Sequence, residues 1–183
     1  MKVAMKVRLA EAQDDTRVGE LLVESFMTAY ARKMPEVVYD EERKRDLRDM
    51  ATKRREATVL VGEVDGEVVG TVMVYAPGVA KNEAWLPNAA DVRQLAIAPA
   101  HFGKGYSEPL MDEAERIAWS WGVGACVLHV RRGAIGVSEV YQKRGYVRAP
   151  EGDRALPTVY LEAYLLRRGL LPSATVVGAG RNS

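Results

Sequence analysis

Apolar and polar residues alternate with two different periods along this chain, and the change of period marks the predicted elements. Apolar residues that recur every three or four positions indicate amphipathic helices, whereas alternation at every second position and short β-branched runs indicate strands. The sequence therefore predicts the order β-α-α-β-β-β-α-β-α-β-β, at residues 7–9, 18–29, 36–56, 58–64, 67–75, 91–98, 110–121, 125–130, 135–143, 145–148 and 158–165.

The clearest local signal is the dipeptide Asp65-Gly66 between two β-branched runs. Both residue types tolerate positive φ, which the favoured two-residue hairpin turns require. The sequence therefore predicts a β-hairpin over residues 58–75. The segment 36–56 mixes charges of both signs around a thin apolar stripe, which indicates one solvated helix.

Length and composition favour one soluble globular domain. The chain has 183 residues, 48% of them hydrophobic and 28% charged, and one core is expected at this length. We expect a single domain over residues 1–168 and a tail of small residues over 169–183. The formal charge of +1 is too small to steer the protein to nucleic acid or a membrane by bulk charge.

Neither a structural zinc site nor a membrane span is expected. Cys126 is the single cysteine and the histidines are His101 and His129, too few for a set of Cys and His ligands. No stretch approaches the ~20 apolar residues of a transmembrane helix. We therefore expect a cytoplasmic protein without a bound metal.

The segment with the clearest chemistry is His101-Phe-Gly-Lys-Gly-Tyr-Ser107, between a predicted strand and a predicted helix. Gly103 and Gly105 let the backbone approach an anion, the helix N-terminus supplies N–H groups, and Lys104 adds a full charge. The pattern is typical of a phosphate-binding loop, although an ordinary connection has the same composition. Glu108 stands where a dinucleotide fingerprint needs its third glycine, which argues against NAD.

Two segments together resemble the GNAT family of N-acetyltransferases. Leu95-Ala-Ile-Ala-Pro99 followed by Phe102-Gly-Lys-Gly-Tyr-Ser107 is similar to the central motif of that family, and Val140-Tyr-Gln-Lys-Arg-Gly-Tyr146 is similar to its later segment. The resemblance implies an α/β fold with a mixed, mostly antiparallel central sheet that splays between two central strands and is flanked by helices. The sequence departs from the family pattern at Phe102, Ser107 and Ala134.

The resemblance also implies the reaction. An enzyme of this family moves an acetyl group from acetyl-CoA directly to a primary amine, here of a small molecule or a peptide, within a ternary complex. The donor is expected between the strands at 91–98 and 125–130. The residues expected to bind it are Leu95, Ala96, Ile97, Phe102, Gly103, Lys104, Gly105, Tyr106 and Ser107.

Tyr141 matches the family position that protonates the departing CoA thiolate. A phenol suits this role because it can donate a proton and is neutral at pH 7. A tyrosine on an amphipathic helix is also commonly a core residue with a wet hydroxyl, so both interpretations apply to Tyr141.

Asp91 opens the strand that is expected to contact the donor, where some members of the family have a carboxylate that accepts the amine proton. Strict alternation places Asp91, Arg93, Leu95 and Ile97 on one side of that strand. The carboxylate is therefore either the general base or the partner of an arginine, Arg93 or Arg131.

Three further residues have weaker claims to a role. Glu83 is a second candidate for the base, and His129 is either a proton relay or a hydrogen-bonded core residue. Cys126 has the features of a small buried hydrophobe. The loops expected to line the acceptor site are 29–35, 81–90 and 149–157.

Other functions compatible with the sequence are a non-catalytic module that binds acyl-CoA or a partner, which Phe102 and Ala134 favour, and an acyltransferase that acts on protein N-termini or lysines. A homodimer is also compatible with the apolar tail and the sheet edges.

Overall fold

The computed structural model describes residues 4–37, 40–134 and 136–169. Almost all of the expected tail at 169–183 lies outside these ranges, as does residue 135. The strands are β1 (Lys6–Leu9), β2 (Thr58–Val64), β3 (Glu67–Tyr75), β4 (Ala89–Ile97), β5 (Ala125–Arg131), β6 (Val147–Arg148), β7 (Arg154–Ala155) and β8 (Tyr160–Arg167). The α-helices are α1 (Asp15–Lys33), α2 (Glu41–Arg48), α3 (Met50–Glu56), α4 (Ser107–Ser120) and α5 (Val137–Lys143), and the 3₁₀ helices are η1 (Ala12–Asp14), η2 (Pro99–His101) and η3 (Pro150–Gly152).

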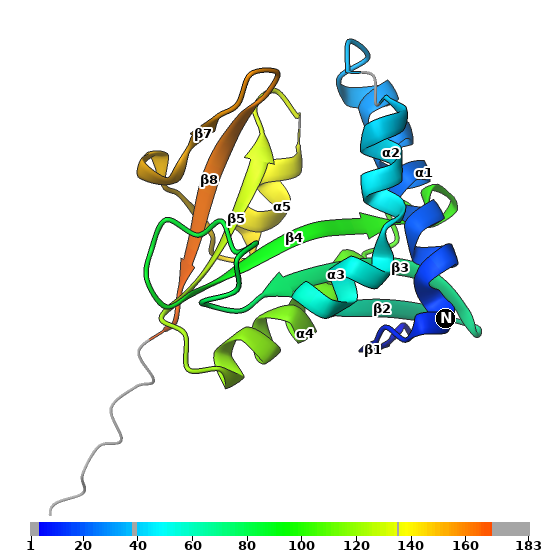
Figure 1. Cartoon of the computed structure of the whole chain (residues 1–183), viewed down its shortest axis with the longest axis horizontal. Helices are drawn as coiled ribbons and strands as arrows, with labels where there is room; N and C mark the ends of the chain where they lie inside the picture. Colours follow the sequence, from blue (N-terminus) through cyan, green and yellow to red (C-terminus); the bar gives the residue numbers. More distant parts are fainter. Residues whose placement is uncertain (1–3, 38–39, 135, 170–183) are drawn as a thin grey trace, which may run out of the picture.

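The strands form one sheet in the order β1-β2-β3-β4-β5-β8-β6, with β7 paired to β8 (Figure 1). Every pair is antiparallel except β4 with β5, which is parallel. The prediction of a mixed, mostly antiparallel sheet flanked by helices is confirmed. The hairpin is confirmed too, since β2 and β3 join at Asp65 and Gly66 with φ of 51° and 80°.

Alternate residues of β2 and β3 separate two cores on opposite faces of the sheet. On one face Leu60, Val72 and Val74 pack with α4 through Leu110 and Met111. On the other face α1, α2 and α3 pack on the sheet, and this core contains Val18, Leu21, Leu22, Leu47, Met50, Val59, Val61 and Met73. Helix α5 lies on the α4 face, because Val137 and Tyr141 pack against the first core.

The single helix predicted over 36–56 is wrong in one respect, because the chain forms two helices there. They meet at Asp49, whose backbone has φ −76° and ψ 68°, outside the helical region. The Asp49 side chain accepts a hydrogen bond of 3.2 Å from the Thr52 N–H and so caps α3. Residues 38 and 39 of the predicted helix lie outside the described residues.

The predicted alternation along β4 is also wrong, because the strand contains a β-bulge. The register against β3 shifts by one residue between the pairs Thr71 with Ala96 and Met73 with Arg93. Gln94 within the bulge has φ 53°, a left-handed conformation.

The bulge divides the side chains that the sequence places together. Asp91 pairs across the sheet with Tyr75, which belongs to the core on the α1 face, and Arg93 lies on the same face. Leu95 and Ile97 pack instead against the core on the α4 face. The inserted residue is what moves them, since an extra residue inverts all later side chains.

Candidate active site

The parallel strands β4 and β5 pair over a short stretch and then separate. Their pairing begins with Ala89 and Ala125 and ends with Asp91 and Val127. Beyond it β4 continues beside β3 to Ile97, and β5 continues beside β8; Figure 1 shows the two strands diverging. Within the described residues, β4 therefore has no strand partner on its β5 side after Asp91. Its peptide groups on that side can pair with another extended chain.

A loop with free backbone donors follows the separated end of β4. Gly103 and Gly105 have φ of 76° and 77°, and Ser107 is the first residue of α4. Among the described residues, no hydrogen bond is found from the backbone N–H groups of residues 103–107, and the first from this segment is Glu108 N–H to Gly105. Consecutive free amides at a helix N-terminus form an anion site.

The side chains of this loop differ in whether they can reach a bound anion. Lys104 Nζ lies 3.3 Å from His101 Nδ1 at the exposed rim, where its charge can reach an anion. Tyr106 is buried beside Val64 and Val69, so its backbone N–H is the part that can face a ligand. The Phe102 ring lies beneath the Arg32 guanidinium of α1, 5.7 Å from its centroid.

The residues predicted on β4 contribute in different ways. Leu95 and Ile97 are partly buried on the α4 face, the same face as the loop helix. Ala96 is buried in the core on the α1 face. The structure therefore places Leu95, Ile97 and the loop on the same face of the sheet. The side chain of Ala96 points to the other face, so only the backbone of Ala96 can contact a donor on this side.

Tyr141 lies in α5 on the α4 face. Its ring meets that of Tyr146 edge to face, with centroids 5.9 Å apart. Burial, and to a smaller degree the neighbouring Tyr30, raises the pKa of Tyr141 to about 12. The hydroxyl is therefore protonated at neutral pH and can donate.

Tyr30 of α1 has neighbours in β5 and an electrostatic effect on α5. It belongs to α1, yet it influences Tyr141 of α5 on the opposite face. The Arg131 guanidinium at the end of β5 lies 5.4 Å from the centroid of the Tyr30 ring. Helices on opposite faces can come close where a sheet is open, so we expect Tyr141 to lie near the separation of β4 and β5.

Asp91 is completely buried and ion-paired. Its Oδ2 accepts hydrogen bonds of 2.7 Å from Arg93 Nε and 2.8 Å from the Glu83 N–H, and Arg93 Nη2 contacts the same oxygen. Its Oδ1 is buried and has no hydrogen-bond partner among the described residues. The arginine pairing that the sequence offers is therefore observed, whereas the role as base stays a prediction.

Two of the predicted acceptor loops meet on the α1 face beside Asp91. Glu83 forms ion pairs with Arg93, at 3.5 Å, and with Arg154 of β7. The Trp85 indole lies directly against Gly152 of η3. Gly152 and Arg154 lie in the predicted acceptor loop 149–157 but could not be singled out from the sequence, because no local pattern pairs residues so far apart in the chain.

Burial limits the chemistry that the Cys126 thiol can perform. Burial raises the pKa of the Cys126 thiol to about 12, so the thiolate needed for a covalent route is scarce. Among the described residues, no group of three His, Cys, Asp or Glu side chains is arranged to hold a metal ion. In the same ranges no helix is long and apolar enough to cross a membrane.

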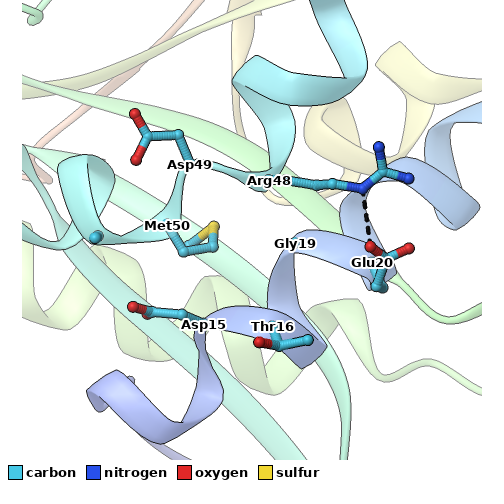
Figure 2. A pocket seen from close by; sticks show the side chains of 8 residues that line it. Asp15, Thr16, Gly19, Glu20, Arg48, Asp49 and Met50 are labelled. Carbon is cyan, nitrogen blue, oxygen red and sulfur yellow. Dashed lines mark hydrogen bonds and ion pairs between the residues drawn. The ribbon is translucent and has the colours of Figure 1, made fainter. Parts of the chain in front are cut away.

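A separate depression of about 270 Å³ lies between α1 and the junction of α2 and α3 (Figure 2). Its charged side chains are already used by the fold. Arg48 Nε contacts Glu20 at 2.8 Å, and Asp15 contacts Arg54 at 2.6 Å. The Cα of Arg48 lies 3.0 Å from where a Cβ on Gly19 would stand. This depression is therefore a consequence of the close packing of α2 on α1.

A known protein family matches the part of the chain that contains β4 and the loop at residues 103–107. Residues 18–146 match the model of the acetyltransferase (GNAT) family. No curated protein matches the chain.

Solved structures share the fold at low sequence identity. PaiA N-acetyltransferase from Thermoplasma acidophilum in complex with coenzyme A is 18% identical, with a TM-score of 0.64 over 87% of this chain and 98% of that one. An acetyltransferase of the GNAT family from Staphylococcus aureus Mu50 is 11% identical, with a TM-score of 0.70 over 90% and 99%. A GNAT family acetyltransferase from Brucella melitensis in complex with acetyl-CoA is 20% identical, with a TM-score of 0.58 over 92% of each chain.

Proposed function

The chain belongs to the acetyltransferase (GNAT) family, and on that premise we propose that it moves an acetyl group from acetyl-CoA to a primary amine of a small molecule or peptide. The family gives acetyl-CoA as the donor. The amine as acceptor, and direct transfer within a ternary complex, belong to the proposal.

The observation that supports it best is the run of free backbone N–H groups from Gly103 to Ser107 at the N-terminus of α4. A diphosphate needs several donors that converge on one region, together with positive potential, and this loop offers both. It directly follows the stretch of β4 without a partner on its β5 side. An extended ligand that carries a diphosphate fits this arrangement, so the residues present suit acetyl-CoA.

When bound, acetyl-CoA supplies a thioester carbonyl and a thiol leaving group. We assign its diphosphate to the amides of residues 103–107 and its extended arm to the backbone of Leu95 and Ile97. Tyr141 is the proton donor to the leaving sulfur, since its hydroxyl is protonated at neutral pH. Cys126 takes no part, because its thiol is buried.

Calorimetric titration with acetyl-CoA, and with S-acetylpantetheine, which lacks the diphosphate, tests the donor site. We expect acetyl-CoA to bind far more tightly. Adding ethanolamine, L-lysine or a short peptide should then release CoA thiol. A protein that binds neither compound is instead the partner-binding module that the sequence also allows.

A matched pair of glycine variants tests the loop itself. Gly103 and Gly66 have φ of 76° and 80°, and a Cβ on either would meet nothing within 4 Å. Valine should therefore strain both positions equally, by about 1–2 kcal/mol. We expect Gly103→Val to weaken acetyl-CoA binding at least tenfold and Gly66→Val, in the hairpin turn, to bind it normally. Equal affinities in the two variants would refute the loop as the diphosphate site.

Three expectations about the whole protein stay predictions: one catalytic domain over residues 1–168, a cytoplasmic location and a homodimer. Sedimentation of the purified protein tests the last of these directly.

A further inference from the structure

His129 lies beside the opening of the sheet on the α1 face. In β5 it follows Val127, the last residue paired with β4, by two positions, and so shares its face. Arg131, two positions further, is the residue that meets Tyr30. His129 is therefore placed between the paired end of the opening and the end that α1 covers.

Two contacts fix the imidazole. Its Nε2 lies 2.9 Å from the carbonyl oxygen of Gly152, and the ring meets the Trp85 indole edge to face, with centroids 5.6 Å apart. A carbonyl oxygen can only accept, so Nε2 must carry the proton. In the neutral ring the other nitrogen, Nδ1, then has a free lone pair and can act as a base.

The opening thus has a proton donor and a proton acceptor on opposite faces. Tyr141 approaches from the α4 face and His129 from the α1 face. Transfer from a thioester to an amine needs both functions: one proton must leave the attacking nitrogen, and one must reach the departing sulfur.

Asp91 is the competing candidate for the acceptor, and its surroundings argue against it. Its carboxylate is completely buried at the paired end of the opening, where Arg93 and the Glu83 N–H occupy Oδ2. His129 is partly exposed and lies past that end. Among the described residues His129 belongs to no ion pair, so a proton can be accepted there without breaking one.

We propose that His129 is a catalytic residue whose Nδ1 accepts the proton of the attacking amine, an inference that rests on the proposed function. The amine nitrogen forms the new bond to the acetyl carbon, and the bond from that carbon to sulfur breaks. The amine proton passes to His129 Nδ1, Tyr141 gives its hydroxyl proton to the sulfur, and solvent returns both residues to their starting states. The products are the amide and free CoA thiol.

The tautomer is tested without turnover, by long-range ¹H–¹⁵N correlation of the imidazole nitrogens. The chain has two histidines, so His101→Gln leaves His129 as the single source of signal in untagged protein. We expect the neutral ring to carry its proton on Nε2. A neutral ring with its proton on Nδ1 would overturn the proposal, because the proposed acceptor would then be occupied.

The catalytic role is tested with His129→Gln, whose side-chain amide can still donate to Gly152. With L-lysine or ethanolamine as acceptor at pH 7, we expect kcat to fall by about 10²–10⁴-fold. The melting temperature and the affinity for acetyl-CoA should not change, whereas a structural role for His129 would change both.

The outcomes separate this proposal from the proposed function. If the wild-type protein transfers acetyl groups and His129→Gln does so equally fast, the role of His129 fails alone. The same holds if Asp91→Asn loses transfer while His129→Gln retains it, because the base is then Asp91. A wild-type protein that binds acetyl-CoA but acetylates no amine refutes the proposed function itself.

Discussion

Gly152→Ala is the substitution for which the structure gives the sharpest steric expectation. A Cβ at this position would stand 2.3 Å from Trp85 Cδ2 and 2.4 Å from both Cε2 and Cε3. Unstrained carbon atoms approach to about 3.5 Å, so the ring or the η3 turn must move by about 1.2 Å. The added Cβ would clash with three atoms of the rigid indole ring at once, so a rotation of one side-chain end cannot relieve the clash. Overpacking of this kind costs about 1–3 kcal/mol.

For a protein of this size such a loss lowers the melting temperature by about 2–12 °C, at 2–4 °C for each kcal/mol. Gly124→Ala is the matched control, because a Cβ there would meet nothing within 4 Å. It should leave the free energy of unfolding unchanged or raise it by about 0.4–1 kcal/mol. Differential scanning calorimetry of both variants checks the expectation. Equal melting temperatures would refute the packing of Gly152 on Trp85.

The same substitution links stability to the proposed chemistry. His129 donates to the Gly152 carbonyl and touches Trp85, so moving either partner moves the imidazole. We therefore expect Gly152→Ala to reduce kcat even at temperatures where it is fully folded.

Three further predictions concern single side chains. Tyr141→Phe should lower kcat by about 10²-fold or more at unchanged acetyl-CoA affinity. Tyr146→Phe, which removes a buried hydroxyl near Glu115, should retain activity, and an equal fall of kcat in the two variants would contradict the role of Tyr141. The Arg148 guanidinium holds the pKa of Asp153 well below its usual range, so the carboxylate stabilises the fold above about pH 4 and loses this effect as the pH falls further. Urea unfolding should show Asp153→Asn less stable than wild type at pH 7, with the gap narrowing at pH 3, and a constant gap would contradict the assignment. Because burial raises the pKa of Cys126 to about 12, a thiol reagent at pH 8 should react with it only after unfolding, and rapid reaction of the folded protein would show that it is accessible.

Local signals predicted the elements well, because each depends on residues close together in the chain. The hairpin at Asp65-Gly66 and the glycine turn at 103–105 have the positive φ values that their residue types favour. The break between α2 and α3 was also encoded locally, since Asp49 is a good N-cap residue. It was not predicted, because charged residues of both signs recur throughout residues 40–56 and indicated one helix.

Features that depend on distant residues could not be predicted in this way. The bulge in β4 places Gln94, a residue with no preference for positive φ, at 53°, and pairing with β3 on one side is what stabilises it. The strict alternation assumed for Asp91 and Leu95 therefore failed. The contact of Glu83 with Arg154 arises when the second half of the sheet packs against the first. The contact of His129 with Gly152 joins β5 to η3, 23 residues apart in the chain.

The short parallel pairing of β4 with β5 also has a consequence for biosynthesis. Strands β1–β4 and helices α1–α4 all precede Ala125 in the chain, so their mutual contacts can form while the remainder is still being translated. The loop at residues 103–107, which we propose binds the diphosphate, belongs to this early part, whereas His129 and Tyr141 belong to the late one. A nascent chain halted before β5 has neither of the proposed proton-transfer groups and lacks Cys126 and Leu128 of the core that packs on α4. Catalytic competence is therefore acquired as a late event of synthesis.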